Sequence, residues 1–303
     1  MTIISNNPVS SGMQTIKKQY QIVSLSVLAA LAALLCQNTA HAACADDWLG
    51  VEEVRDGGNI GLRATNLREF PITFTLRVRT RDLVADGPRT ITETLDGEQS
   101  RMIMTLREDG GDRKGIYRIS CDWTIGDKDA LHDDEYLYQL PYEIGKSYRV
   151  LQGYGSRFSH RGLEQYAVDF NMTVGTPVHA ARGGVVAKIE ESNKKGCWDD
   201  GCGAFANYIV VVHSDGTTGE YYHLQLGGAL VEVGDYIVPG QKIGSSGNTG
   251  HTTMPHLHFA VYRAAEWGNT QSIPIRFMSS AGIVHSPRRG GRYQAISEQR
   301  AYN

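Results

Sequence analysis

The 303-residue chain is poor in proline and cysteine, and neither sign of charge dominates it. It contains 9 Pro and 5 Cys, and 30 Lys and Arg against 33 Asp and Glu leave a net charge of −3. With 41% hydrophobic residues, this composition excludes disordered, collagen-like and coiled-coil chains as overall classes. Because no basic excess creates a global field, no nucleic-acid partner is expected.

The first 42 residues lack acidic side chains and lack an apolar run long enough to cross a membrane. A Lys17-Lys18 pair precedes an apolar run from Ile22 to Cys36, which falls short of the roughly 20 residues that a spanning helix needs. The small residues in Ala40-His41-Ala42 fit the rule for signal peptidase. We therefore interpret residues 1–42 as a signal peptide; a retained anchor is the alternative.

This interpretation predicts export. Counted from Met13 the segment has an ordinary length for a signal peptide, so Met13 is an alternative start to Met1. The mature protein, which begins at Ala43, is expected in the periplasm or outside the cell, free of the membrane and monomeric.

Removal of residues 1–42 leaves four cysteines. They are Cys44, Cys121, Cys197 and Cys202. An even count in an exported chain favours two disulfides, for which three pairings exist. The short spacing favours a bond between Cys197 and Cys202, which leaves Cys44 with Cys121. A zinc site is the alternative, but the spacing is not Cys-x-x-Cys.

The mature chain divides into two parts of different charge. Residues 43–142 hold 13 Lys and Arg against 20 Asp and Glu, whereas residues 143–303 hold 15 against 13. Alternating runs at Ile72–Arg79 and Ile116–Trp123, separated by Gly- and Asp-rich turns, predict a small antiparallel β-sandwich for 43–142. It shows no catalytic cluster and is interpreted as an accessory domain.

The second part is also rich in predicted strands. Val185–Ile189, Tyr208–His213 and Leu257–Tyr262 are strand-like, and the polar loop Ser192–Ala206 is expected to form the wall of a cleft. The fold class is therefore all-β, with a second β-rich domain over residues 143–285 and a C-terminal tail over 286–303.

Two histidines two positions apart mark one candidate site. His256 and His258 lie in a strand-like run, where alternate side chains share a face, while Leu257 and Phe259 point to the opposite face. Neighbouring imidazoles suit Zn²⁺. His-x-His alone is a weak signal, and structural histidines are the alternative.

A carboxylate in an apolar run marks a second candidate site. Asp169 is the single charge in an apolar run, and a metal ion or strong hydrogen bonds would keep it ionised. His160 lies nine positions earlier, so the two side chains converge only if the chain turns between them, which Gly162 permits. His223 follows another strand-like run and is a candidate general base.

Together these motifs resemble the lysostaphin/LytM-type zinc metalloendopeptidases over about residues 150–262. The matching segments, in order, are His160, Asp169-Phe170, Gly175–Ala180, Gly183–Val186, His213, Asp215-Gly216, Tyr222–Leu224, Val233–Asp235, Gly240–Gly244, Ser246–Gly250 and Pro255–Phe259. The resemblance implies a LytM-type antiparallel β-sheet peptidase domain of the duplicated hybrid motif fold.

The resemblance also implies the roles of five residues. One Zn²⁺ per chain would be held by His160, Asp169 and His258, and His223 and His256 would be the catalytic pair that does not bind metal. Which of the two is the base stays open. The family usually has His-x3-Asp, whereas eight residues separate the pair here, and Met254 stands where the family commonly has Gly.

The implied function is that of an exported zinc metalloendopeptidase. It would hydrolyse peptide bonds in peptidoglycan cross-links with zinc-activated water, so that the peptidoglycan peptide is its substrate. Two alternatives stay open at this point: a non-catalytic family member that binds peptidoglycan or activates an amidase, and a zinc peptidase that acts on Gly-rich proteins.

Overall fold

The computed structural model describes residues 47–111 and 113–297 of the chain. The predicted signal peptide, its cleavage site and Cys44 lie outside these residues. Within the described part of the chain, no helix is long and apolar enough to cross a membrane.

The described residues form an all-β structure, which confirms the predicted fold class. Its only helices in these ranges are three short 3₁₀ segments, η1 (Gly162–Glu164), η2 (Cys202–Phe205) and η3 (Glu266–Gly268). The strands are β1 (Leu49–Asp56), β2 (Asn59–Asn66), β3 (Ile72–Arg81), β4 (Leu83–Ala85), β5 (Thr90–Leu95), β6 (Ser100–Glu108), β7 (Ile116–Ile125), β8 (Leu137–Tyr138), β9 (Ser147–Gln152), β10 (Val168–Phe170), β11 (Pro177–His179), β12 (Gly184–Glu190), β13 (Gly196–Cys197), β14 (Tyr208–Val212), β15 (Thr218–Tyr222), β16 (Leu224–Ala229), β17 (Tyr236–Ile237), β18 (Lys242–Ser246), β19 (Gly250–His251), β20 (Leu257–Ala264), β21 (Thr270–Ser272), β22 (Arg276–Ser279), β23 (Gly282–Val284) and β24 (Arg292–Gln294).

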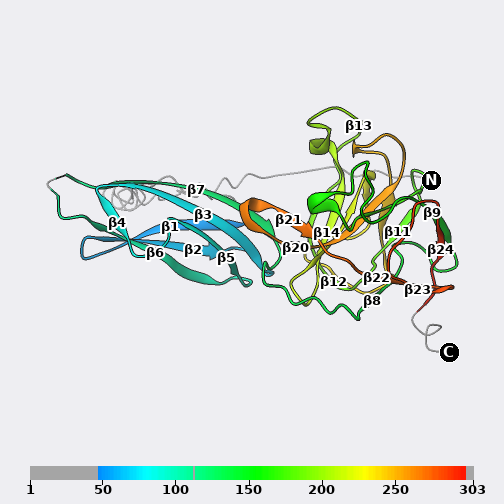
Figure 1. Cartoon of the computed structure of the whole chain (residues 1–303), viewed down its shortest axis with the longest axis horizontal. Helices are drawn as coiled ribbons and strands as arrows, with labels where there is room; N and C mark the ends of the chain where they lie inside the picture. The colour runs from blue at the N-terminus through cyan, green and yellow to red at the C-terminus, as the bar shows by residue number, and fades with distance from the viewer. Residues whose placement is uncertain (1–46, 112, 298–303) are drawn as a thin grey trace, which may run out of the picture. The chain divides into compact units, whose positions relative to one another are not determined.

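Strands β1 to β7, blue to green in Figure 1, form two antiparallel sheets. Their orders are β1-β2-β6-β4 and β5-β3-β7. Both sheets contribute to one hydrophobic cluster, with Leu62 from β2 and Phe74 and Leu76 from β3 among its fully buried members. Such burial follows from the period-2 alternation of the sequence, because one face of each sheet must be covered.

The functional region lies on a nine-stranded sheet. Its order is β17-β12-β14-β15-β20-β10-β9-β24, with β21 paired to β20. Apolar side chains such as Tyr221, Phe259 and Phe170 fill the core behind it. Strands β15, β20, β10 and β9 are neighbours in this sheet, so segments far apart in the sequence present their side chains on one face.

The loop Ser192–Ala206, which is predicted to form a cleft wall, contains β13, and β13 pairs parallel with β19. The paired residues Gly196 and Gly250 leave no room for a side chain: a Cβ on Gly196 would lie 2.0 Å from Asn248 O, and one on Gly250 would lie 2.6 Å from Ala206 Cβ. Gly250 also has φ +84°. The Cys197–Cys202 disulfide closes this loop. Cys121 is also disulfide-bonded.

Candidate metal centre

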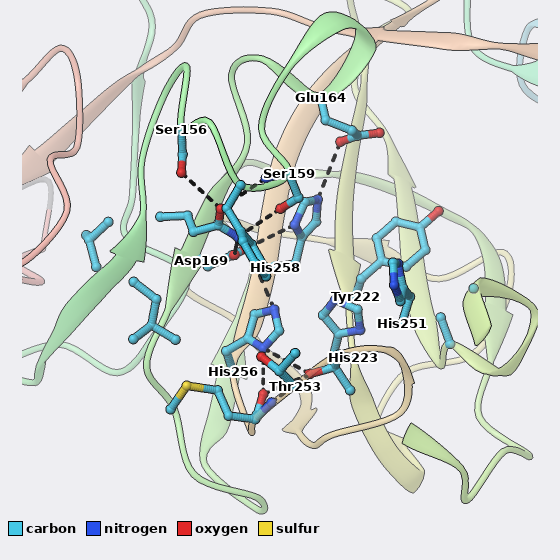
Figure 2. Close-up of a pocket in the computed structure, with 18 of the residues that line it drawn as sticks. Ser156, Ser159, Glu164, Asp169, Tyr222, His223, His251, Thr253, His256 and His258 are labelled. Carbon is cyan, nitrogen blue, oxygen red and sulfur yellow. Dashed lines mark hydrogen bonds and ion pairs between the residues drawn. The ribbon is translucent and has the colours of Figure 1, made fainter. Parts of the chain in front are cut away.

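A pocket of about 670 Å³ opens on the face formed by β9, β10, β20 and β15. Figure 2 shows the side chains that line it. Asp169, His223, His256 and His258 all line the pocket, together with Glu164. The wall that carries Trp198 and His251 comes from the disulfide-closed loop and β19.

Asp169 and His258 meet because β10 and β20 pair antiparallel with these two residues directly opposite each other. Opposed residues of an antiparallel pair project from the same face of the sheet. Asp169 Oδ1 lies 2.9 Å from His258 Nδ1. Asp169 is almost completely buried, as the single charge in its apolar strand predicts.

His160 arrives from the segment between β9 and β10. Gly162 has φ +58° and begins η1, so the chain turns between His160 and Asp169 as predicted. His160 Nδ1 donates to Gly153 O at 3.2 Å. Its other ring nitrogen, Nε2, is buried without a hydrogen-bond partner and lies 3.2 Å from Asp169 Oδ1.

The donor set fits a zinc ion. One ligand atom from each of His160, Asp169 and His258 lies within 4.8 Å of the other two. Two imidazole nitrogens and a carboxylate oxygen are ordinary Zn²⁺ ligands, and three protein ligands leave one position open. His160 Nε2 is buried without a hydrogen-bond partner on the side of Asp169, and a metal ligand at this atom would satisfy it.

Charge in the cluster is stabilised by its own members. Burial raises the pKa of Asp169, but the neighbouring imidazole of His160 and the hydrogen bond with His258 hold that pKa well below its usual value. Burial lowers the pKa of His258, whereas hydrogen bonds to Asp169 and Glu164 raise it to about 10.

His223 and His256 form a second pair of imidazoles in the pocket. His223 Nδ1 donates to Thr249 O at 2.7 Å, and His256 Nδ1 donates to Met254 O at 2.7 Å. Each Nε2 therefore carries a lone pair. Burial and the neighbouring His256 lower the pKa of His223 to about 3, and burial lowers the pKa of His256.

His223 also has an unusual backbone. Its φ is +65°, a left-handed conformation that costs a residue with a Cβ about 1 kcal/mol or more. The residue lies between β15 and β16, so the turn aims its ring into the pocket rather than along either strand.

Aromatic rings and Met254 line the outer part of the pocket. His251 lines the pocket and stacks on Trp198 with ring centroids 4.1 Å apart, which puts it at the rim. Trp198 also stacks on Phe158 at 5.0 Å, so residues from three segments meet there. Met254 lies in the pocket lining, and its main-chain carbonyl accepts a hydrogen bond from His256 Nδ1.

Several pocket residues lie outside the motifs that mark the candidate site in the sequence. Gln152 Nε2 donates to Asp169 Oδ2 at 2.6 Å. Glu164 faces His258, and Tyr262 lies beside both. Glu220 is buried, and burial raises its pKa to about 7. The alternation of charged Glu220 with Tyr221 along one strand could have indicated a polar face.

A carboxylate and two imidazoles around one point, next to two neutral imidazoles in an open pocket, are the parts of a metal-dependent hydrolase site. Residues 164–272 match the model of peptidase family M23. The chain therefore carries an M23 peptidase domain. The matched range contains Asp169, His223, His256 and His258, and His160 lies just before it.

Known proteins resemble the same region. The chain is 37% identical over 137 residues to the glycyl-glycine endopeptidase ALE-1 of Staphylococcus capitis, which is 45% of this chain and 35% of that protein. It is 33% identical over 143 residues to the peptidoglycan DD-endopeptidase ShyA of Vibrio cholerae, 46% of this chain and 30% of that protein. The solved catalytic domain of lysostaphin from Staphylococcus simulans is 32% identical, over 43% of this chain and 88% of that one, with a TM-score of 0.30. The matches thus span about a third of the two curated relatives.

Proposed function

We propose that the chain is an exported zinc metalloendopeptidase that hydrolyses peptide bonds in peptidoglycan cross-links. The observation that carries the proposal is the convergence of His160, Asp169 and His258 beside the neutral His223 and His256 in one open pocket. The two relatives described above are named as a glycyl-glycine endopeptidase and a peptidoglycan DD-endopeptidase. These names support peptidoglycan peptides as the substrate class.

Each residue has a role in this proposal. His160, Asp169 and His258 would hold one Zn²⁺, with His160 Nε2, Asp169 Oδ1 and His258 Nδ1 as the nitrogen and oxygen atoms that lie closest together. When bound, Zn²⁺ is a Lewis acid that polarises a carbonyl and acidifies water. Gly153 O and Gln152 Nε2 hold His160 and Asp169 in their orientations.

The paired imidazoles move the protons. Since Nδ1 of His223 and of His256 donates to a main-chain carbonyl, each Nε2 has a lone pair that can accept a proton. One imidazole accepts the proton of the attacking water, and the proton then passes to the leaving amine as the peptide bond breaks. Asp169 Oδ1, 3.8 Å from His256 Nε2, favours the protonated form of that ring.

The experiment measures zinc content and the release of muropeptides from purified sacculi by the mature protein. Sacculi with glycine bridges and sacculi with direct cross-links are compared, because the two relatives are named for the cleavage of different bonds. One equivalent of zinc with release of cross-link fragments supports the proposal. Zinc without cleavage of either substrate contradicts it and favours a binding role.

A further inference from the structure

The segment between two of the proposed zinc ligands brings a second carboxylate to the far side of a ligand histidine. Glu164, at the end of η1, lies with Oε2 3.5 Å from His258 Nε2, on the ring edge opposite Asp169. Figure 2 shows His258 between the two carboxylates. Tyr262 follows His258 by four residues in β20. Its hydroxyl donates to Glu164 Oε2 at 2.6 Å.

This arrangement sets the position of the proton on His258. An ionised carboxylate only accepts hydrogen bonds. Because the Tyr262 hydroxyl gives its proton to Glu164, its oxygen, 3.3 Å from His258 Nε2, also acts as an acceptor. Both neighbours of Nε2 therefore require a proton on that nitrogen. In the neutral ring the lone pair is then on Nδ1, the atom that faces Asp169 Oδ1.

Glu164 is held in place by contacts that do not involve the metal ligands. Gln271 Nε2 donates to Gly162 O at 3.3 Å, and Tyr166 N donates to Ser272 Oγ at 3.0 Å. Both contacts attach the η1 segment to β21, which pairs with the strand that carries His258. The eight residues between His160 and Asp169 thus form a structured connection, and their length is what allows Glu164 to reach His258.

We propose that Glu164 is a positioning residue that fixes the tautomer and orientation of His258, so that Nδ1 is presented to the zinc ion. The inference rests on the proposed zinc site. A carboxylate that accepts from the outer N–H of a ligand histidine raises the basicity of the ligand, and loss of such a partner typically costs about 10–100-fold in metal affinity.

The test compares zinc affinity, by chelator competition, among the wild-type chain, Glu164→Ala, Glu164→Gln and Glu266→Gln. Glu266 is an exposed carboxylate on η3 with no side-chain partner among the contacts of the described residues, so its variant is the matched control for loss of one charge. We expect about 10–100-fold weaker zinc binding in Glu164→Ala. Glu164→Gln, which keeps an acceptor oxygen but not the charge, should fall between it and the wild type.

A second readout separates positioning from general destabilisation. In the zinc-loaded wild type, ¹H–¹⁵N spectra should show a slowly exchanging proton on His258 Nε2, and this signal should be lost in Glu164→Ala. Zinc affinities within twofold of wild type in both Glu164 variants would overturn the inference. If Glu164→Ala does not fold, Glu164→Gln decides. A wild-type chain that binds no zinc would instead refute the proposed function.

Discussion

The imidazoles of His223 and His256 lie with ring centroids 4.5 Å apart, although their residues come from different strand connections. Neither ring is in the group of three that could hold a metal. The proposed function therefore divides the site into two layers, one that would bind the ion and one that would handle protons, and substitutions should separate them.

Substitution of one residue in each layer tests this division. His258→Ala should lose zinc and activity together, because it removes one of three ligands. His223→Ala should keep zinc and lose turnover by about 100-fold or more, since it removes only a proton acceptor. Zinc content by metal analysis and muropeptide release check both. Full activity in either variant would refute the assigned role.

Glu220 predicts a specific pH dependence of stability. Burial raises the pKa of its carboxyl to about 7 from an ordinary 4.5, and Thr218 and Tyr222 donate to it. The folded chain thus binds this proton more tightly than the unfolded chain. Its stabilising contribution is complete below pH 4.5 and is lost as pH rises through 7.

Glu220→Gln should remove this dependence because the amide stays neutral. Relative to wild type, the free energy of unfolding of the variant should increase by about 3 kcal/mol between pH 4 and pH 8. Urea unfolding of the metal-free proteins at both pH values measures the change, with Glu266→Gln as the control. A constant difference between variant and wild type would contradict the raised pKa.

The Cys197–Cys202 disulfide should matter for the pocket wall more than for the metal. Replacement of both cysteines by serine opens a short loop, for which chain entropy predicts a loss of about 2 kcal/mol. Because Trp198 lies inside this loop and stacks on His251, KM should rise while zinc content stays unchanged. Steady-state kinetics and metal analysis give the two values. An unchanged KM would show that this wall does not contact substrate.

Gly250 of β19 and Gly203 of η2, two elements that contact each other, provide a matched pair for backbone strain. Gly250→Ala adds a Cβ 2.6 Å from Ala206 Cβ at φ +84°, so it should destabilise the chain by about 2 kcal/mol or more. A Cβ on Gly203 meets nothing within 4 Å, so Gly203→Ala should change stability by less than about 0.5 kcal/mol. Thermal unfolding compares the two. Equal effects would contradict the close packing of β19 on η2.

The sequence predicts the parts of this structure that depend on local pattern. The all-β class follows from alternation in runs such as Ile72–Arg79, which the structure contains within β3. His256 and His258, predicted to share a strand face, both line the pocket, although β20 begins only at Leu257. The functional assignment of the histidines depends on the family resemblance, and it stays a prediction.

Residues that act through long-range pairing could not be found this way. Gln152 and Glu164 are ordinary polar residues in their local settings, and only the pairing of β9 and β20 with β10 brings them to the ligands. The left-handed backbone of His223 is equally invisible, because no glycine or asparagine marks it.

Asp169 and His258 lie directly opposite each other in β10 and β20, so the candidate metal centre forms only when these two strands pair in the correct register. A slip of one residue would turn Asp169 to the other face of the sheet and destroy the ligand set. An ion that binds only the correct pairing stabilises that pairing over every slipped alternative by mass action. Zinc in the folding buffer should therefore increase the yield of native chain, because it stabilises the correctly paired sheet relative to misaligned sheets.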